Sequence, residues 1–239
     1  MRIQIQNNRA KVGVAMVSKK ELLRKETEIA KLYINVFGGP PWFEKARIFQ
    51  DGNWKRVGTD EELKQVDLLL AQGLLRGEDI KPFYTEKGVV EDIRTCAASG
   101  GFIGILAVNM QTSRVVGASW GMNASQVSDL QKLRDIEIIA NIRNLKMNEI
   151  TYLDEMFVLA EYRNIGIGNT MLKIEGISAV RNGCTYSLCR TINPVIVNGL
   201  RRNFGGENVF EVYRDQNDEQ TERRYYLTKL ASIRREYED

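Results

Sequence analysis

The feature that most constrains this sequence is an apolar stretch that runs directly into a turn with two closely spaced glycines. Residues 150–159 have strand character, Arg163-Asn164-Ile165-Gly166-Ile167-Gly168 follows, and helical periodicity begins at once. Glycine permits positive φ angles and lets a ligand approach the backbone. Successive N–H groups in such a turn form an anion-binding nest, and the helix N-terminus adds partial positive charge. The sequence therefore predicts a pyrophosphate-binding site at this turn.

Two common phosphate-binding motifs are excluded at this turn. A dinucleotide fingerprint needs a third small residue for close helix–strand packing, and Met171 occupies that position. A P-loop needs Gly-Lys-Ser/Thr, which is missing.

Apolar periodicity along the rest of the chain predicts a mixed α/β fold. Helices are expected at about residues 22–36, 59–75, 85–98, 127–145, 167–181 and 195–202. Strands are expected at about residues 11–17, 102–110, 115–122, 150–159, 185–190, 209–213 and 224–230. The segment that carries Phe43 and Trp54 is predicted to be irregular. Strands 150–159 and 185–190 enclose one helix, so we expect them to be parallel neighbours that separate beyond Val158. No linker-like stretch interrupts residues 1–239, which predicts a single domain.

Composition narrows the function classes. The chain contains no histidine, which excludes a His-containing zinc site, a Ser-His-Asp triad and a Cys-His dyad, and we expect no metal. A net charge of +3, from 34 basic and 31 acidic residues, predicts no nucleic-acid partner. The start of the chain lacks a signal-peptide apolar run, and no stretch is long enough to span a bilayer. We therefore expect a cytoplasmic protein without a membrane partner.

The segment from Leu153 to Gly168 resembles the GNAT superfamily of acyl-CoA-dependent N-acyltransferases, whose signature is Gln/Arg-x-x-Gly-x-Gly/Ala after the fourth strand. Three further segments are similar to the family: Val116-Gly117, Asn193-Pro194 and Leu200 to Gly206. The resemblance covers residues 150–230 well and 10–122 loosely. It implies an α/β fold with a central mixed sheet flanked by helices, with insertions at about residues 43–82 and 123–149.

The resemblance also implies a cosubstrate, acetyl-CoA, and an acceptor, the primary amine of a small molecule or peptide. Like an added strand, the pantetheine amides would pair with the backbone of Met156, Phe157 and Val158. The amides from Asn164 to Asn169 would hold the pyrophosphate, and Asn193 would contact the pantetheine arm. The cofactor-binding set is then Met156, Phe157, Val158, Arg163, Asn164, Ile165, Gly166, Ile167, Gly168, Asn169, Thr170 and Asn193. A homodimer is left open.

An acceptor amine must lose a proton before it can attack. Without histidine, the base must be a carboxylate, a tyrosinate, a thiolate or water. Asp154 lies where many family members place the base, and it is preferred over Glu155. Because strand side chains alternate, Glu155 is expected on the opposite face of the strand. Periodicity does not choose between the two carboxylates.

One position departs from the family pattern. Many members carry a tyrosine seven residues after the asparagine that reprotonates the leaving thiolate, and Leu200 stands there. Tyr186, Tyr213 or water could replace it. The departure leaves a second interpretation open, a catalytically weak or inactive acyl-CoA-binding regulatory module. Cys189 is expected to be a buried strand residue rather than an acyl carrier.

Overall fold

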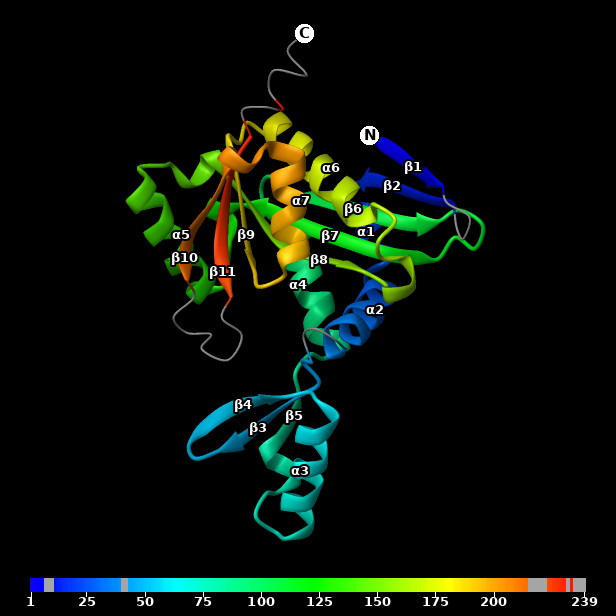
Figure 1. Ribbon diagram of the computed structural model, residues 1–239, viewed down its shortest axis with the longest axis vertical. Coiled ribbons are helices and arrows are strands. Elements are labelled where there is room, and N and C mark those ends of the chain that lie inside the picture. The colour runs from blue at the N-terminus through cyan, green and yellow to red at the C-terminus, as the bar shows by residue number, and fades with distance from the viewer. Residues whose placement is uncertain (7–10, 40–42, 215–222, 231–232, 234–239) are drawn as a thin grey trace. The chain divides into compact units, whose positions relative to one another are not determined.

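The computed structural model describes residues 1–6, 11–39, 43–214, 223–230 and 233. The chain forms two compact units (Figure 1). One unit joins Met1–Lys25 to Ile93–Asp239, and the other is Glu26–Asp92. The single domain with insertions at residues 43–82 and 123–149 stays a prediction.

An eight-stranded mixed sheet forms the centre of the larger unit. Every pair of neighbouring strands in it is antiparallel, except the parallel pair β8–β9. In spatial order, the strands are β1 (Arg2–Gln6), β2 (Lys11–Val17), β6 (Ile103–Asn109), β7 (Val115–Asn123), β8 (Ile150–Val158), β9 (Tyr186–Thr191), β11 (Arg224–Lys229) and β10 (Val209–Arg214). The predicted α/β fold class with a central mixed sheet is confirmed.

Burial explains why the middle strands are continuous apolar runs. In β7, every residue from Val115 to Met122 is buried, so both faces of this strand are covered. β1 lies at the sheet edge and alternates exposed with half-buried residues, and the sequence prediction missed it.

The helices of the larger unit follow the predicted periodicity, except that a turn at Arg24 and Lys25 divides the helix predicted at residues 22–36. They are α1 (Lys19–Leu23), α5 (Leu130–Arg143), α6 (Ile167–Arg181), α7 (Pro194–Phe204) and the end of α4 (Glu86–Ala98). Short 3₁₀ turns are η2 (Ala124–Gln126), η3 (Met147–Glu149), η4 (Ala160–Tyr162) and η5 (Gly206–Asn208). Asp129 begins α5 by accepting hydrogen bonds from the N–H groups of Gln131 and Lys132, both at 2.9 Å.

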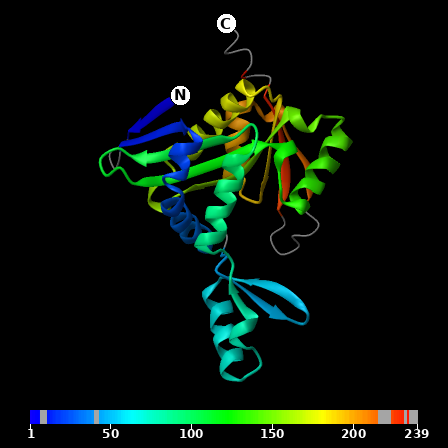
Figure 2. The ribbon, with the colours of Figure 1, turned by 180° about the vertical axis from the view of Figure 1, so that it is seen from behind.

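Strand register identifies the face of the sheet that each of two helices covers. Thr151 pairs with Ser187, whose hydroxyl donates to Oε1 of Glu175 on α6 at 3.1 Å. Tyr225 of β11 lies on the opposite face, and its hydroxyl donates to Oδ2 of Asp135 on α5 at 3.1 Å. The sheet therefore separates α6 (yellow in Figure 1) from α5 (green in Figure 2).

The smaller unit has its own sheet and core. It contains α2 (Glu26–Gly38), α3 (Asp60–Ala71), η1 (Gly77–Asp79) and a three-stranded antiparallel sheet in the order β4 (Asn53–Val57), β3 (Ala46–Gln50), β5 (Ile80–Pro82). Ile48, Val57, Val66 and Leu75 form its core. The prediction of an irregular segment was wrong at Trp54, which lies in β4 opposite Phe49 of β3.

Within the described ranges, no helix combines the length and the apolar character that a bilayer-spanning segment needs.

Candidate active site

Strands β8 and β9 pair over only part of their length. The parallel register runs from Ile150 and Tyr186 to Leu153 and Cys189. Beyond it, β8 continues to Val158 in register with β7. The two strands are parallel neighbours, as predicted, but they separate after Leu153 and not beyond Val158. This earlier separation gives Met156, Phe157 and Val158 a β8 edge that the parallel ladder does not use.

The chain then turns into α6 through two left-handed residues. Asn164 has φ 63° and Gly166, the residue that begins α6, has φ 92°. Nε of Arg163 donates to the carbonyl oxygen of Val158 at 3.0 Å, which ties the turn to the end of β8. Among the described residues, the first amide after Arg163 that donates to a backbone carbonyl is that of Thr170, which donates to Gly166 at 3.0 Å.

The two glycines of the turn face open space. A Cβ atom added at Gly166 or at Gly168 would meet nothing within 4 Å. Gly166 needs its positive φ, but Gly168 has no such need and sits inside a helix, where glycine costs about 0.5–1 kcal/mol relative to alanine. Among the residues that the structure describes, none accounts for glycine at position 168. A ligand that approaches the first turn of α6 would account for it.

This turn fits an anionic group such as a pyrophosphate. A helix N-terminus presents N–H groups and partial positive charge, and Gly166 has no side chain that could cap them. Among the predicted cofactor residues, Asn164 and Gly166 are exposed, Ile165, Gly168 and Thr170 are half-buried, and Ile167 is buried.

Two of the three asparagines in the predicted set, Asn169 and Asn193, have structural contacts of their own. Nδ2 of Asn203 donates to the carbonyl of Asn169 at 3.0 Å, which joins α7 to the first turn of α6. Oδ1 of Asn193 accepts a hydrogen bond from the N–H of Val195 at 3.0 Å and caps α7. Their roles toward a cofactor stay predictions.

A β-bulge in β8 interrupts the regular alternation of side chains at the two candidate bases. Trp120 of β7 pairs with Glu155 and Gly121 pairs with Leu153, so Asp154 is an extra residue. Glu155 therefore shares the α5 face with Tyr152, and both interact electrostatically with Lys132 of α5. The expectation that Asp154 and Glu155 lie on opposite faces was wrong, because alternation fails at a bulge.

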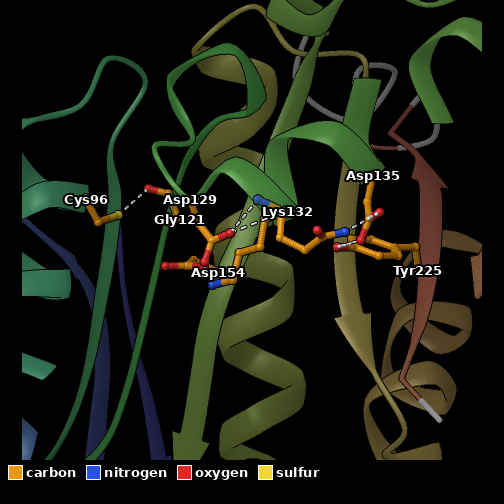
Figure 3. Close-up of polar contacts among 8 residues, drawn as sticks. Cys96, Gly121, Asp129, Lys132, Asp135, Asp154 and Tyr225 are labelled. Atoms are coloured by element: carbon orange, nitrogen blue, oxygen red, sulfur yellow. Dashed lines mark hydrogen bonds and ion pairs between the residues drawn. The ribbon is translucent and has the colours of Figure 1, made fainter. Parts of the chain in front are cut away.

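Asp154 is held in an ion pair (Figure 3). Nζ of Lys132 lies 2.6 Å from Oδ1 of Asp154, and the two side chains are only 19% and 12% exposed. Lys132 also lies over the ring of Tyr152, with Nζ 5.9 Å from the ring centroid. Burial lowers the pKa of Lys132, but the nearby negative charges, mainly that of Asp154, have a larger effect in the opposite direction. The pKa of Lys132 is therefore raised, and the ammonium is retained.

The pKa of Glu155 is raised well above that of an ordinary carboxyl. Burial raises the pKa of Glu155 to about 7, against the lowering effect of Lys132, Arg223 and Arg190. A group with this pKa can take and release a proton near neutral pH. The pKa of the Cys189 thiol is raised by burial to about 12, so the thiol stays protonated near neutral pH.

The sequence analysis missed the contribution of α5. Lys132 and Asp135 lie on the helical stripe that also contains buried Ile136 and Ile139. Two charged residues on an apolar stripe were the available signal, because such a stripe faces the core. The residue at the family's tyrosine position, Leu200, is buried in α7.

Comparison with known proteins identifies the fold. No protein-family model and no curated protein sequence matches the chain. Among solved structures, the C-terminal condensation domain of Ebony, determined with beta-alanyl-dopamine, has a TM-score of 0.54 at 10% identity, covering 92% of this chain and 99% of that one. Arylalkylamine N-acetyltransferase 7 of the yellow fever mosquito has a TM-score of 0.51 at 11% identity, covering 96% and 94%.

A GNAT-family acetyltransferase of Listeria monocytogenes is also similar, with a TM-score of 0.50 at 12% identity, covering 95% of this chain and 99% of that chain. The chain therefore has the fold of the GNAT acetyltransferases.

Proposed function

We propose that this protein is an N-acetyltransferase that moves an acetyl group from acetyl-CoA directly to a primary amine in a ternary complex. The observation that carries the proposal is the open glycine turn at the start of α6, beside the β8 edge that separates from β9. A pyrophosphate and an extended amide-bearing arm are the two recognition elements of coenzyme A. The turn suits the first and the strand edge suits the second.

Different residues of the chain would bind different parts of acetyl-CoA. The backbone of Met156, Phe157 and Val158 would pair with the pantetheine amides, and the amides from Asn164 to Asn169 would hold the pyrophosphate. Arg163 contributes indirectly, because its side chain fixes the carbonyl of Val158. Asn193 would present its side-chain amide to the pantetheine arm from the start of α7. Acetyl-CoA would supply an activated thioester and a thiolate leaving group.

Glu155 is the base that we favour. An amine with a pKa of about 10.4 costs about 4.6 kcal/mol to neutralise at pH 7, so a nearby proton acceptor lowers the barrier. Asp154 is engaged with Lys132, whereas the pKa of Glu155 is raised to about 7. Glu155 would accept the amine proton, directly or through water, as the amine nitrogen attacks. This reverses the sequence-based preference for Asp154.

No side chain is assigned as the acid. A thiol has a pKa of about 8.5, so the thiolate is a tolerable leaving group and water can reprotonate it. Because buried Leu200 stands in place of the family's tyrosine, a second function is retained as an alternative, namely a coenzyme A-binding module without turnover.

Turnover on a panel of amines tests the proposed reaction and separates it from this second function. The assay measures release of the coenzyme A thiol from acetyl-CoA, with polyamines, amino acids, arylalkylamines and peptides as acceptors. An N-acetyltransferase releases thiol only with an accepted amine and yields the N-acetylated product by mass spectrometry. Binding of acetyl-CoA without product from any amine would support the non-catalytic module instead.

A further inference from the structure

A cluster of ionisable side chains fills the face of the sheet that α5 covers. It contains two residues of α5 and others from three strands, and Figure 3 shows four of its members: Lys132, Asp135, Asp154 and Tyr225. Its members are Lys132, Asp135, Tyr152, Asp154, Glu155, Arg190 and Tyr225, and we call it the α5 cluster. The glycine turn and the thioester chemistry require none of the α5 residues, so their placement needs an explanation.

Lys132 stands out in the α5 cluster because its ammonium is mostly buried and directly paired. Nζ lies 2.6 Å from Oδ1 of Asp154, and the lysine side chain is 19% exposed. Burying an ammonium costs several kcal/mol unless a partner compensates it. Asp154 compensates it here, so each charge depends on the other.

Because of the bulge, the ion pair between Lys132 and Asp154 lies on the same side of the sheet as Glu155. Asp154 is the extra residue in β8, and Glu155 is its immediate neighbour on the α5 side. Two adjacent carboxylates in a low-dielectric site cannot both ionise easily, and they then share a proton. An ammonium that is paired with one of the two carboxylates offsets the repulsion between them.

We propose that Lys132 is a positioning residue for the acyl-transfer reaction, because its ammonium pairs with Asp154 and so leaves Glu155 without an uncompensated carboxylate as its neighbour. The proposal rests on the proposed function for its catalytic meaning. The electrostatic coupling itself exists with or without a substrate. Lys132 comes from α5, whereas both carboxylates come from β8.

The other charged groups around Glu155 act in both directions. Negative charge comes from Asp154 on β8, and positive charge comes from Lys132 on α5, Arg190 on β9 and Arg223 just before β11. Tyr152, Tyr225 and the Cys96 thiol of α4 stay neutral near pH 7, since burial raises the pKa of each well above that range. Asp135 is bonded to Tyr225. Lys132 and Asp154 are thus the pair whose removal tests the proposal.

The test measures the ionisation of Glu155 directly, in the protein without acetyl-CoA. Carboxyl carbons of glutamate are labelled with ¹³C, and the Glu155 signal is assigned by its loss in Glu155→Gln. Its titration midpoint is then compared between wild type, Lys132→Met, Lys132→Arg, Asp154→Asn and the double variant Lys132→Met/Asp154→Asn. Methionine keeps the length of the lysine stem, and circular dichroism checks that each variant is folded.

The expected midpoints follow from the charges. Lys132→Met raises the Glu155 midpoint by about one pH unit or more, because it removes a nearby cation and leaves Asp154 uncompensated. Asp154→Asn lowers the midpoint, and Lys132→Arg leaves it near the wild-type value. The double variant returns it toward the wild-type value, which a purely structural role for Lys132 would not do.

Two results would overturn the proposal. One is an unchanged Glu155 midpoint in Lys132→Met, and the other is a double variant whose midpoint equals that of Lys132→Met alone. If Lys132→Met does not fold, an unchanged midpoint in Asp154→Asn has the same force. Since no step of this titration uses acetyl-CoA, failure of the proposed acetyltransferase activity would leave the result intact.

Discussion

The extra residue at position 154 gives two neighbouring carboxylates different chemistry. Asp154 sits in the bulge and is paired with Lys132 at 2.6 Å. Glu155 lies next to it on the α5 face and, chiefly because of burial, has its pKa raised to about 7. Asp154 is therefore held in an ion pair, whereas Glu155 has a pKa near neutral pH.

Replacing Glu155 is the activity test at this scale. We expect Glu155→Gln to lower acetyl transfer at neutral pH by about 10²–10⁴-fold, which is the usual contribution of a general base. In the wild type, the rate should rise with pH through about 7, because the base must lose its proton. The variant should lose this step and recover only toward the amine pKa. Steady-state rates across pH 5–10 provide the measurement.

Asp154→Asn is the matched control for that experiment. Its loss of rate should be the smaller of the two, and its affinity for acetyl-CoA should be nearly unchanged. A large loss in Asp154→Asn together with full activity in Glu155→Gln would return the role of base to Asp154.

Glu175 offers a stability test that is independent of function. The side chain is 1% exposed on α6, accepts one hydrogen bond from Ser187, and its Oε2 has no hydrogen-bond partner among the described residues. Burial raises its pKa to about 7. The folded state therefore binds the proton more tightly than the unfolded state. The buried Glu175 carboxyl therefore destabilises the folded state only where the unfolded chain would ionise it. This effect is absent below about pH 4.5 and grows as the pH rises to about 7.

From this shift, we expect the free energy of unfolding to fall by about 3 kcal/mol between pH 4.5 and 7.5 on account of Glu175. Glu175→Gln should remove that part of the pH dependence. Urea unfolding of both proteins at several pH values measures it. Equal pH dependence in the two proteins would show that the Glu175 carboxyl has an ordinary pKa.

Residue-scale chemistry was only partly predictable from the sequence. The predicted strand, turn and helix are confirmed, so Asp154 and Glu155 lie in β8 and the two glycines lie at the start of α6. A bulge depends on pairing with β7, which local sequence does not encode, so the relative faces of the carboxylates were predicted wrongly. Lys132 pairs with Asp154 across a long sequence separation, and no spacing pattern links them.

At the scale of elements, glycines divide α6 into an open start, where we propose that the ligand binds, and a packed middle. A Cβ at Gly168 would meet nothing, whereas a Cβ at Gly176 would lie 2.6 Å from the ring of Phe204 on α7. The first glycine keeps space open and the second lets α7 approach. The same helix thus serves the site at one end and the core in its middle.

Alanine substitutions should separate these two uses. Gly168→Ala should raise the stability of the ligand-free protein by about 0.5–1 kcal/mol, because alanine favours the helix, while weakening acetyl-CoA binding about tenfold. Gly176→Ala should lower Tm, because overpacking costs about 1–3 kcal/mol and helix propensity offsets only part of it. Thermal melts with and without acetyl-CoA measure both. A Gly168→Ala variant with unchanged acetyl-CoA affinity would contradict the ligand-facing use.

Elements with strong periodicity were predictable, and short ones were not. The strands from β6 to β9 and the helix α6 follow from their apolar runs. In β3 and β4, the aromatic residues Phe49 and Trp54 are both exposed, so these five-residue strands lack the burial pattern of core strands. The alternation of Ile3 and Ile5 was the available signal for β1.

At the scale of the whole molecule, the larger unit contains every residue of the proposed site. The glycine turn, the separation of β8 from β9 and the α5 cluster all belong to it. The account therefore makes one central claim, that the start of α6 binds the pyrophosphate of acetyl-CoA. The claim stands even if the protein has no turnover.

Ligand-dependent thermal stability of Gly166→Asp tests this claim most directly. The new carboxylate would lie against the pyrophosphate, where like charges a few Å apart repel by about 1–4 kcal/mol. Gly183→Asp is the matched control, because Gly183 follows the other end of α6, has φ 83°, and also has nothing within 4 Å of an added Cβ. Both variants bear similar backbone strain, but only one alters the turn.

For the wild type and for Gly183→Asp, acetyl-CoA at 100 times its dissociation constant should stabilise the fold by about 2.7 kcal/mol. Each kcal/mol corresponds to about 2–4 °C in Tm for a chain of this size. Gly166→Asp should show no shift at the same concentration. A wild type that does not shift at millimolar acetyl-CoA, or a Gly166→Asp variant that shifts as much as the wild type, would contradict the account.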